Sequence, residues 1–138
     1  MITDETGATY GYAIEFTGAE HVTVKNCEIN ASATSTSSLS MPIRNVTGAN
    51  VEYCTIENNS LNNGYYGMYW YGGNTSTKEI GNVIKNNTIR NFNIYGMMFY
   101  YQGGGTVEGN YIEQSTSATS SSYGMYIYYN DSVKVKAN

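Results

Sequence analysis

The sequence predicts an all-β fold in which the chain winds as a solenoid of short strands, and two repeats predict it. A motif of the form V/I-x-x-N/C-x-I recurs along the 138 residues, and a Tyr-Gly-aromatic run recurs between its copies. The composition agrees with strands, because charged residues make up only 13% while Gly and Tyr each occur 15 times. A helix bundle needs more Ala, Leu, Glu and Lys, and a disordered chain has fewer aromatic and β-branched residues.

The spacing of the first motif sets the length of one turn of the solenoid. Five copies of the motif begin at Val24, Val51, Ile84, Val107 and Val135. The fifth copy lacks the final Ile. They start roughly 23 to 33 residues apart, a period typical of solenoids in which each unit stacks on its neighbours. Leucine-rich repeats are excluded because the only leucines are Leu39 and Leu61. No window has the spacing of an amphipathic helix.

Each repeat contains three short β-rich runs that are separated by Gly, Asn, Ser and Thr turns. Three short strands per turn is the layout of a parallel β-helix. We therefore expect a single β-helix domain over residues 1–138, with about five coils. The expected coils are residues 10–38, 39–63, 64–93, 94–121 and 122–138.

The register can be expressed as columns, because equivalent residues of successive coils lie about 4.8 Å apart. One predicted column alternates in charge, so that neighbours attract: Lys25, Glu52, Lys85, Glu108 and Lys136. A second column lies in the turns and consists of Cys27, Cys54, Asn87, Asn110 and Asn138. We expect its Asn side chains to form a ladder of stacked amides, and its two Cys side chains to stack as reduced thiols. A third predicted row, a stack of ion pairs, consists of Glu57, Arg90 and Glu113.

Three phrases, HVTVKNCEI, GANVEYCTIENN and NVIKNNTIRN, resemble the right-handed parallel β-helix repeats of the pectin-lyase-like superfamily. The resemblance extends from about Tyr10 to the end of the chain, and it implies a right-handed coil with stacked Asn residues in its turns. It implies little about activity. The superfamily contains pectate lyases, polygalacturonases, phage tailspikes, adhesins and surface proteins without known chemistry.

The Tyr-Gly-aromatic runs are expected to form strands with one apolar and one phenolic face, because successive side chains point to opposite sides of a strand. The inward set is Met68, Trp70, Met97, Phe99, Met125 and Ile127. The outward set is Tyr69, Tyr71, Tyr100, Tyr126 and Tyr128, with Met98 between Tyr69 and Tyr126. The matching strand of the second coil contains Pro42 and is expected to be short or distorted, since proline is unsuited to a central strand.

Two interpretations of the outward tyrosines stay open. The rings can stabilise and cover the sheet or dock onto another domain, or they can form a platform that packs against sugars and hydrogen-bonds them. In the resembling enzymes this sheet commonly lines the sugar-binding cleft, so the resemblance implies a polysaccharide or glycan as partner. The candidate carbohydrate-binding residues are Tyr69, Tyr71, Tyr100, Tyr126 and Tyr128.

The residues that polysaccharide cleavage needs are scarce. Asp4 and Asp131 are the only aspartates. The Asn-x-Asp, Gly-His-Gly and Arg-x-Lys motifs of polygalacturonases and the acidic calcium cluster of pectate lyases are missing. The only histidine, His21, is predicted to be a hydrogen-bonded turn residue, and the periodic methionines to fill the core. We therefore expect no catalytic residue, metal site or cofactor in this segment.

Charge and hydropathy narrow the expected partners. The net charge is −4 and there is no basic cluster, so we expect no nucleic acid partner. No apolar run reaches the roughly 18 residues of a membrane span, so we expect no membrane insertion. The start, MITDETGATY, carries no secretion signal, and the last motif copy is incomplete. We expect a segment of a longer β-helix from a secreted or cell-surface protein, with open ends that contact further coils end to end.

The leading functional hypothesis is a non-catalytic β-helix segment that acts as a scaffold or as a carbohydrate-contacting surface. The alternative is a part of a polysaccharide lyase or glycoside hydrolase whose catalytic residues lie outside this segment.

Overall fold

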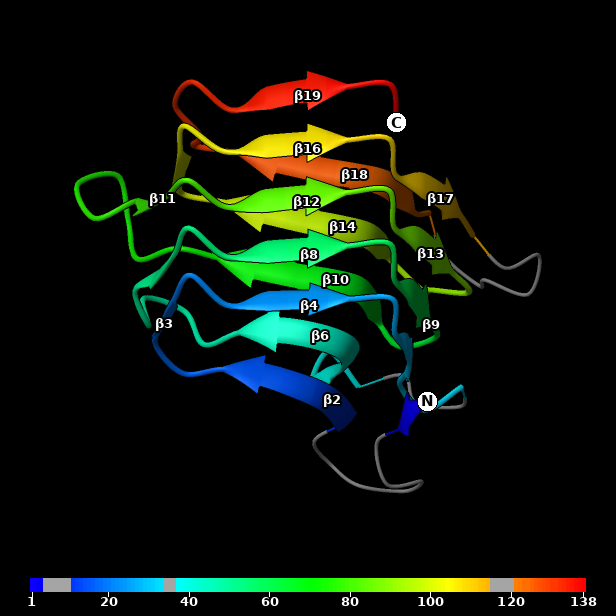
Figure 1. Cartoon of the computed structure of the whole chain (residues 1–138). Helices are drawn as coiled ribbons and strands as arrows, with labels where there is room; N and C mark the ends of the chain where they lie inside the picture. Colours follow the sequence, from blue (N-terminus) through cyan, green and yellow to red (C-terminus); the bar gives the residue numbers. More distant parts are fainter. Residues whose placement is uncertain (4–10, 34–36, 115–120) are drawn as a thin grey trace.

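The chain folds as a parallel β-helix, as predicted. The computed structural model describes residues 1–3, 11–33, 37–114 and 121–138, and every regular element in these ranges is a strand. The strands stack into three five-stranded sheets that form the sides of the solenoid (Figure 1). Four coils are complete, and β18 and β19 begin another, so the expectation of about five coils is slightly too high.

The first sheet, here called the long sheet, is made of strands of six residues each. These are β2 (Gly11–Phe16), β6 (Ser40–Asn45), β10 (Tyr66–Tyr71), β14 (Tyr95–Tyr100) and β18 (Tyr123–Tyr128). They pair in parallel in the order β2-β6-β10-β14-β18, one strand from each coil.

The second and third sheets have shorter strands. The second, here called the charged sheet, contains β4 (Thr23–Lys25), β8 (Thr55–Glu57), β12 (Val83–Lys85), β16 (Thr106–Glu108) and β19 (Lys134–Lys136). The third sheet contains β1 (Ile2–Thr3), β5 (Glu28–Asn30), β9 (Ser60–Asn62), β13 (Thr88–Arg90) and β17 (Tyr111–Glu113). Two short pairs lie between the long and charged sheets: β3 (Ala19–Glu20) with β7 (Val51–Glu52), and β11 (Glu79–Ile80) with β15 (Gln102–Gly103).

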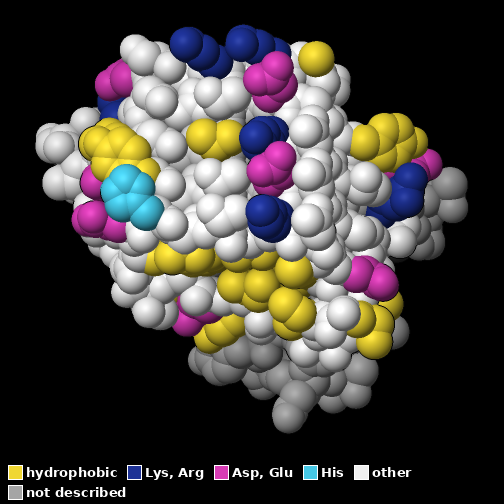
Figure 2. All heavy atoms as spheres, in the orientation of Figure 1, with side chains coloured by type: hydrophobic (Ala, Val, Ile, Leu, Met, Phe, Trp, Pro, Cys, Tyr) yellow, Lys and Arg dark blue, Asp and Glu magenta, His cyan; other side chains and the backbone are white. Residues whose placement is uncertain are grey.

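The predicted charge column is correct in four of its positions and wrong in the second coil. Lys25 and Lys85 pair in register with Glu57, and not with Glu52, which pairs instead with Glu20 in the β3–β7 corner. The alternation of sign nevertheless survives, as the central column of Figure 2 shows. The Lys85 ammonium lies 3.2 Å from the Glu57 carboxylate.

The same shift of five residues changes the turn column. The ladder residue of the second coil is Asn59, and Cys54 lies one corner earlier, where its backbone N–H donates to the Asn82 amide oxygen at 3.0 Å. The predicted stacking of Cys27 on Cys54 is therefore wrong, although both thiols are free, as expected.

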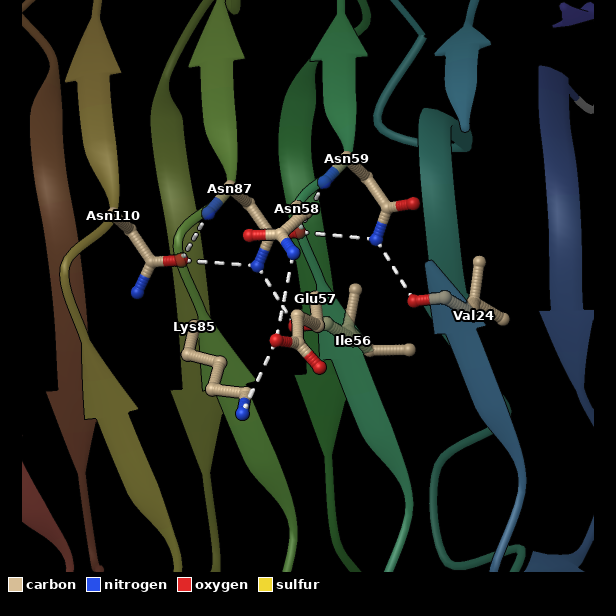
Figure 3. Close-up of polar contacts among 8 residues, drawn as sticks. All are labelled: Val24, Ile56, Glu57, Asn58, Asn59, Lys85, Asn87 and Asn110. Atoms are coloured by element: carbon tan, nitrogen blue, oxygen red, sulfur yellow. Dashed lines mark hydrogen bonds and ion pairs between the residues drawn. The ribbon is translucent and has the colours of Figure 1, made fainter. Parts of the chain in front are cut away.

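The amide ladder itself is continuous along the solenoid (Figure 3). Each ladder residue donates its backbone N–H to the amide oxygen of the next coil at 3.0 Å, in the order Cys27, Asn59, Asn87, Asn110 and Asn138. The residue before it has a left-handed backbone at Asn26, Asn58, Asn86 and Gly109. Asn and Gly tolerate this conformation better than other residues, which explains the Asn-rich turns.

The predicted row of ion pairs on the third sheet is half right. Arg90 pairs with Glu113 at 3.1 Å. Its neighbour in the preceding coil is Asn62, and Glu57 belongs to the charged sheet.

The interior is apolar, and it is lined by the inward set of the long sheet together with single residues of the other two sheets. Trp70 and Phe99 are fully buried, and the Phe16 and Trp70 rings meet edge to face with centroids 5.2 Å apart. Pro42 does not shorten its strand, because β6 has six residues like its neighbours. It does disturb the pairing, since β6 and β10 share only the registered pair Arg44–Tyr69.

A column of glycines lets the long sheet approach the third sheet at their common corner. A Cβ atom on Gly67 would contact the Ile89 side chain and lie 2.6 Å from the Gly96 carbonyl oxygen. A Cβ on Gly96 would contact Ile112 and lie 2.5 Å from the Gly124 carbonyl oxygen. Close packing between successive coils therefore requires the glycine of the Tyr66–Gly67 and Tyr95–Gly96 pairs.

Candidate functional site

The outward side of the long sheet carries the predicted tyrosine columns, and the register confirms their positions. Tyr71, Tyr100 and Tyr128 pair in one column, and Tyr69, Met98 and Tyr126 in the column beside it. We call this surface the tyrosine face. It comprises these residues together with Tyr66, Tyr95, Tyr101, Tyr123 and Tyr129.

A third column of tyrosines was not predicted. Strict alternation along β10 places Tyr66 on the same side as Met68, which is inside the core. The alternation breaks at Gly67, so that both Gly67 and Met68 are buried and the Tyr66 ring lies 5.5 Å from that of Tyr69. Tyr95 and Tyr123 continue this column in the next two coils. The repeated Tyr-Gly pair was the signal that could have revealed it.

The rings of the tyrosine face pack on one another. The Tyr71 and Tyr100 rings are 4.8 Å apart and within 9° of parallel. Tyr66 and Tyr95 stack at 5.6 Å, and Tyr101 and Tyr129 stack at 5.2 Å. Each ring thereby covers part of its neighbour, and most of these side chains are half-buried while those of the last coil are more exposed. The surface therefore presents ring edges and hydroxyl groups more than open ring faces.

The phenol groups of the tyrosine face lie close enough to raise one another's pKa. The neighbouring Tyr129 raises the pKa of Tyr128. Burial and the neighbouring phenols raise the pKa of Tyr66 to about 12. Burial together with the hydrogen bond to Tyr126 raises the pKa of Tyr100. Each hydroxyl has one donor and two acceptor positions, so a bond to a neighbour leaves capacity for a ligand.

The tyrosine face has one charged pair at its N-terminal end. Arg44 lies 3.3 Å from the Glu15 carboxylate, and its guanidinium group is over the rings of Tyr12 and Tyr69 at 5.3 and 5.7 Å from their centroids. Arg44 pairs in register with both Glu15 and Tyr69, so the charged pair continues the column that Tyr69 begins.

A buried polar cluster lies at the corner between the long and charged sheets. The Glu79 carboxylate is almost fully buried and accepts hydrogen bonds from Asn45 at 2.7 Å, from the Val51 backbone N–H at 3.2 Å and from Gln102 at 3.0 Å. No cation contributes to these three bonds. Burial raises the pKa of Glu79, and the hydrogen bonds and the nearby Glu52 modify that effect.

This buried carboxylate predicts a specific pH dependence of stability. Because the folded state raises the pKa of Glu79, its contribution is most favourable below the ordinary pKa of about 4.5 and is lost as pH rises through the raised value. The free energy of unfolding of wild type minus that of Glu79→Gln should therefore fall with rising pH, by about 1.4 kcal/mol for each unit of pKa shift. Urea titrations of both proteins from acidic to neutral pH measure this difference in the free energy of unfolding. A difference that stays constant or rises with pH would contradict the prediction.

The remaining candidate positions have structural surroundings. His21 is a turn residue, as predicted, whose backbone N–H donates to the Glu52 carbonyl and whose ring stacks on Tyr53 at 5.2 Å. Met68 and Met97 are fully buried. Within the described ranges, no group of three or more His, Cys, Asp or Glu side chains is placed to hold a metal ion. The described part of the chain also holds no helix of the length and apolarity that a membrane crossing requires.

Comparison with known proteins supports the fold. A family model described as "Right handed beta helix region" matches residues 43–138. No curated protein and no solved structure shows a significant match to the chain.

Proposed function

The chain belongs to the right-handed β-helix family, and on that premise we propose that it is a non-catalytic scaffold of a secreted or cell-surface protein that contacts carbohydrate through its tyrosine face. The single observation that carries this proposal is the alignment of Tyr71, Tyr100 and Tyr128 with two flanking columns on one outward side. Sugars are bound by surfaces that combine apolar ring carbons with hydroxyl donors and acceptors, and tyrosine supplies both.

The alternative is a part of a polysaccharide lyase or glycoside hydrolase whose catalytic residues lie outside this segment, and the described residues add no catalytic group of their own to it. Cleavage of a glycosidic bond needs a carboxylate pair or a base with a metal ion facing the sugar. The one charged pair on the tyrosine face is Glu15 with Arg44, and each neutralises the other. Elsewhere Asp131 is paired with Lys78, and Glu79 is inside the solenoid.

The proposal predicts that the chain binds polysaccharide through the tyrosine face. Affinity gel electrophoresis against a panel of neutral and acidic polysaccharides should show retardation of the wild-type chain. Tyr71→Ala/Tyr100→Ala/Tyr128→Ala should weaken the binding at least about tenfold, which corresponds to about 1.4 kcal/mol. Circular dichroism checks that the variant is folded.

The matched control is Tyr53→Ala/Tyr111→Ala, which removes two exposed tyrosines that lie outside the tyrosine face. This control should bind as tightly as wild type. Equal binding by the triple variant, or equal loss in the control, would remove the tyrosine face from the proposal.

A further inference from the structure

The charges and the periodicity of the tyrosine face define which carbohydrate it fits. Resting on the proposed function, we propose that this face binds an uncharged polysaccharide whose chain runs along the solenoid axis, with successive sugar units against successive coils.

The positions of the positive charges favour an uncharged ligand. All seven Lys and Arg residues of the chain lie in its described part, and among them Arg44 has its guanidinium over a ring of the tyrosine face, where Glu15 already pairs with it. Four lysines lie on the charged sheet: Lys25, Lys85, Lys134 and Lys136. Lys78 pairs with Asp131, and Arg90 pairs with Glu113 on the third sheet. A polyuronate on the tyrosine face would therefore meet no free cation, while the net charge of −4 would repel it.

Two hydroxyls of the column that begins at Tyr66 are held uncharged by their surroundings. Burial and neighbouring phenols raise the pKa of Tyr66 to about 12, and burial raises that of Tyr95. Both groups are therefore neutral donors and acceptors at physiological pH. Such groups match the hydroxyls of a neutral sugar, each of which also donates one hydrogen bond and accepts others.

The direction of the ligand follows from the register. Along the axis, the same hydroxyl recurs in three successive coils, as in the columns Tyr66–Tyr95–Tyr123 and Tyr71–Tyr100–Tyr128. Along a single strand the tyrosines are unevenly spaced, since Tyr69 is three residues after Tyr66 and Tyr71 is two residues after Tyr69. A polymer of identical units is matched only by the periodic direction, and ring spacings of 4.8 to 5.6 Å in these columns set the repeat.

Two variants test the chemical class, with hydroxyethyl cellulose as the neutral probe and polygalacturonate as the acidic one. Tyr71→Phe/Tyr100→Phe/Tyr128→Phe keeps the rings and removes three hydroxyls, and it should weaken binding to hydroxyethyl cellulose at least about tenfold. Met98→Lys places one cation in the centre of the face, and it should create binding to polygalacturonate that high salt abolishes. Wild-type binding to hydroxyethyl cellulose should be insensitive to salt.

The outcomes separate this inference from the proposed function. If wild type binds neither polymer nor any other glycan, the proposed function itself fails. If wild type binds polygalacturonate at least as tightly as hydroxyethyl cellulose, the uncharged class is wrong while carbohydrate binding stands. If the Phe variant binds as wild type does, the tyrosine hydroxyls do not recognise the sugar, and the match between neutral hydroxyls on which the inference rests is wrong. Affinity for neutral oligosaccharides should rise with each added unit up to about the number of stacked coils. A plateau at two units would overturn the axial direction.

Discussion

Asn87→Ala is expected to lower the free energy of unfolding by about 3 kcal/mol or more, because it breaks the amide ladder at its buried centre. The Asn87 amide oxygen accepts from the backbone N–H and the side-chain amide of Asn59 at 3.0 and 3.1 Å. Its nitrogen donates to the Ile56 carbonyl at 2.9 Å and to the Asn110 amide oxygen at 3.0 Å. Alanine removes these four hydrogen bonds from buried groups, and a typical domain has only about 5–15 kcal/mol of stability in total.

The control for this prediction is the neighbouring turn residue. Asn86→Gly removes an exposed amide and keeps the left-handed backbone, and Gly109 already occupies the equivalent position in the next coil. Guanidinium titrations should show a change within about 0.5 kcal/mol for this variant, as for most surface substitutions. Equal midpoints for Asn86→Gly and Asn87→Ala would mean that the ladder contributes little.

Gly96→Ala is expected to destabilise the fold by about 3 kcal/mol, the upper part of the range for overpacked interiors. The new Cβ would meet the Ile112 side chain, lie 2.9 Å from the Phe92 ring and lie 2.5 Å from the Gly124 carbonyl oxygen. A side chain can move, but the carbonyl belongs to the strand of the next coil. The two coils must therefore separate, and thermal unfolding monitored by circular dichroism should show a clear loss of midpoint temperature.

Gly124→Ala is the matched control, because Gly124 occupies the same position one coil later. In the long sheet, β18 is the edge strand of the described chain, so no strand covers Gly124 on that side. The nearest atom to a Cβ on Gly124 would be the Ile112 Cγ2 at 3.9 Å. This variant should be neutral or more stable by about 0.4–1 kcal/mol, through the reduced entropy of the unfolded chain. Similar losses for both variants would show that the backbone freedom of glycine, and not contact between coils, explains why glycine recurs at this position.

The sequence was sufficient to predict the fold and the faces of the long sheet, because both depend on repeated local patterns. The inward and outward sets of β10, β14 and β18 follow from simple alternation after each Tyr-Gly pair. The register of the second coil could not be predicted from the repeated pattern. Val51–Ile56 matches the motif fully, whereas the true counterpart, Ile56–Leu61, ends in Leu where the motif has Ile. Only the amide contact of Asn59 with its neighbours in the next coil distinguishes the two.

The candidate site was predicted less completely than the fold. Tyr69, Tyr71, Tyr100, Tyr126 and Tyr128 were placed correctly on the outward side. The column that begins at Tyr66 was missed because it depends on a break in the pleat at Gly67, which alternation cannot show. The stacking of the tyrosine rings on one another could not be predicted from the sequence either, because it depends on side-chain rotamers. Whether the tyrosines bind carbohydrate stays a prediction.

The connections at the two corners of the third sheet differ in how much their lengths vary from coil to coil. Between the charged and third sheets the connection is always two residues, as at Asn26–Cys27 and Asn86–Asn87. Between the third and long sheets the connections differ in length: residues 31–39, 63–65, 91–94 and 114–122. We therefore expect the second corner to accept a reporter peptide or a new recognition segment, whereas a single inserted residue at the first corner would move the ladder residue out of contact with the coils on either side.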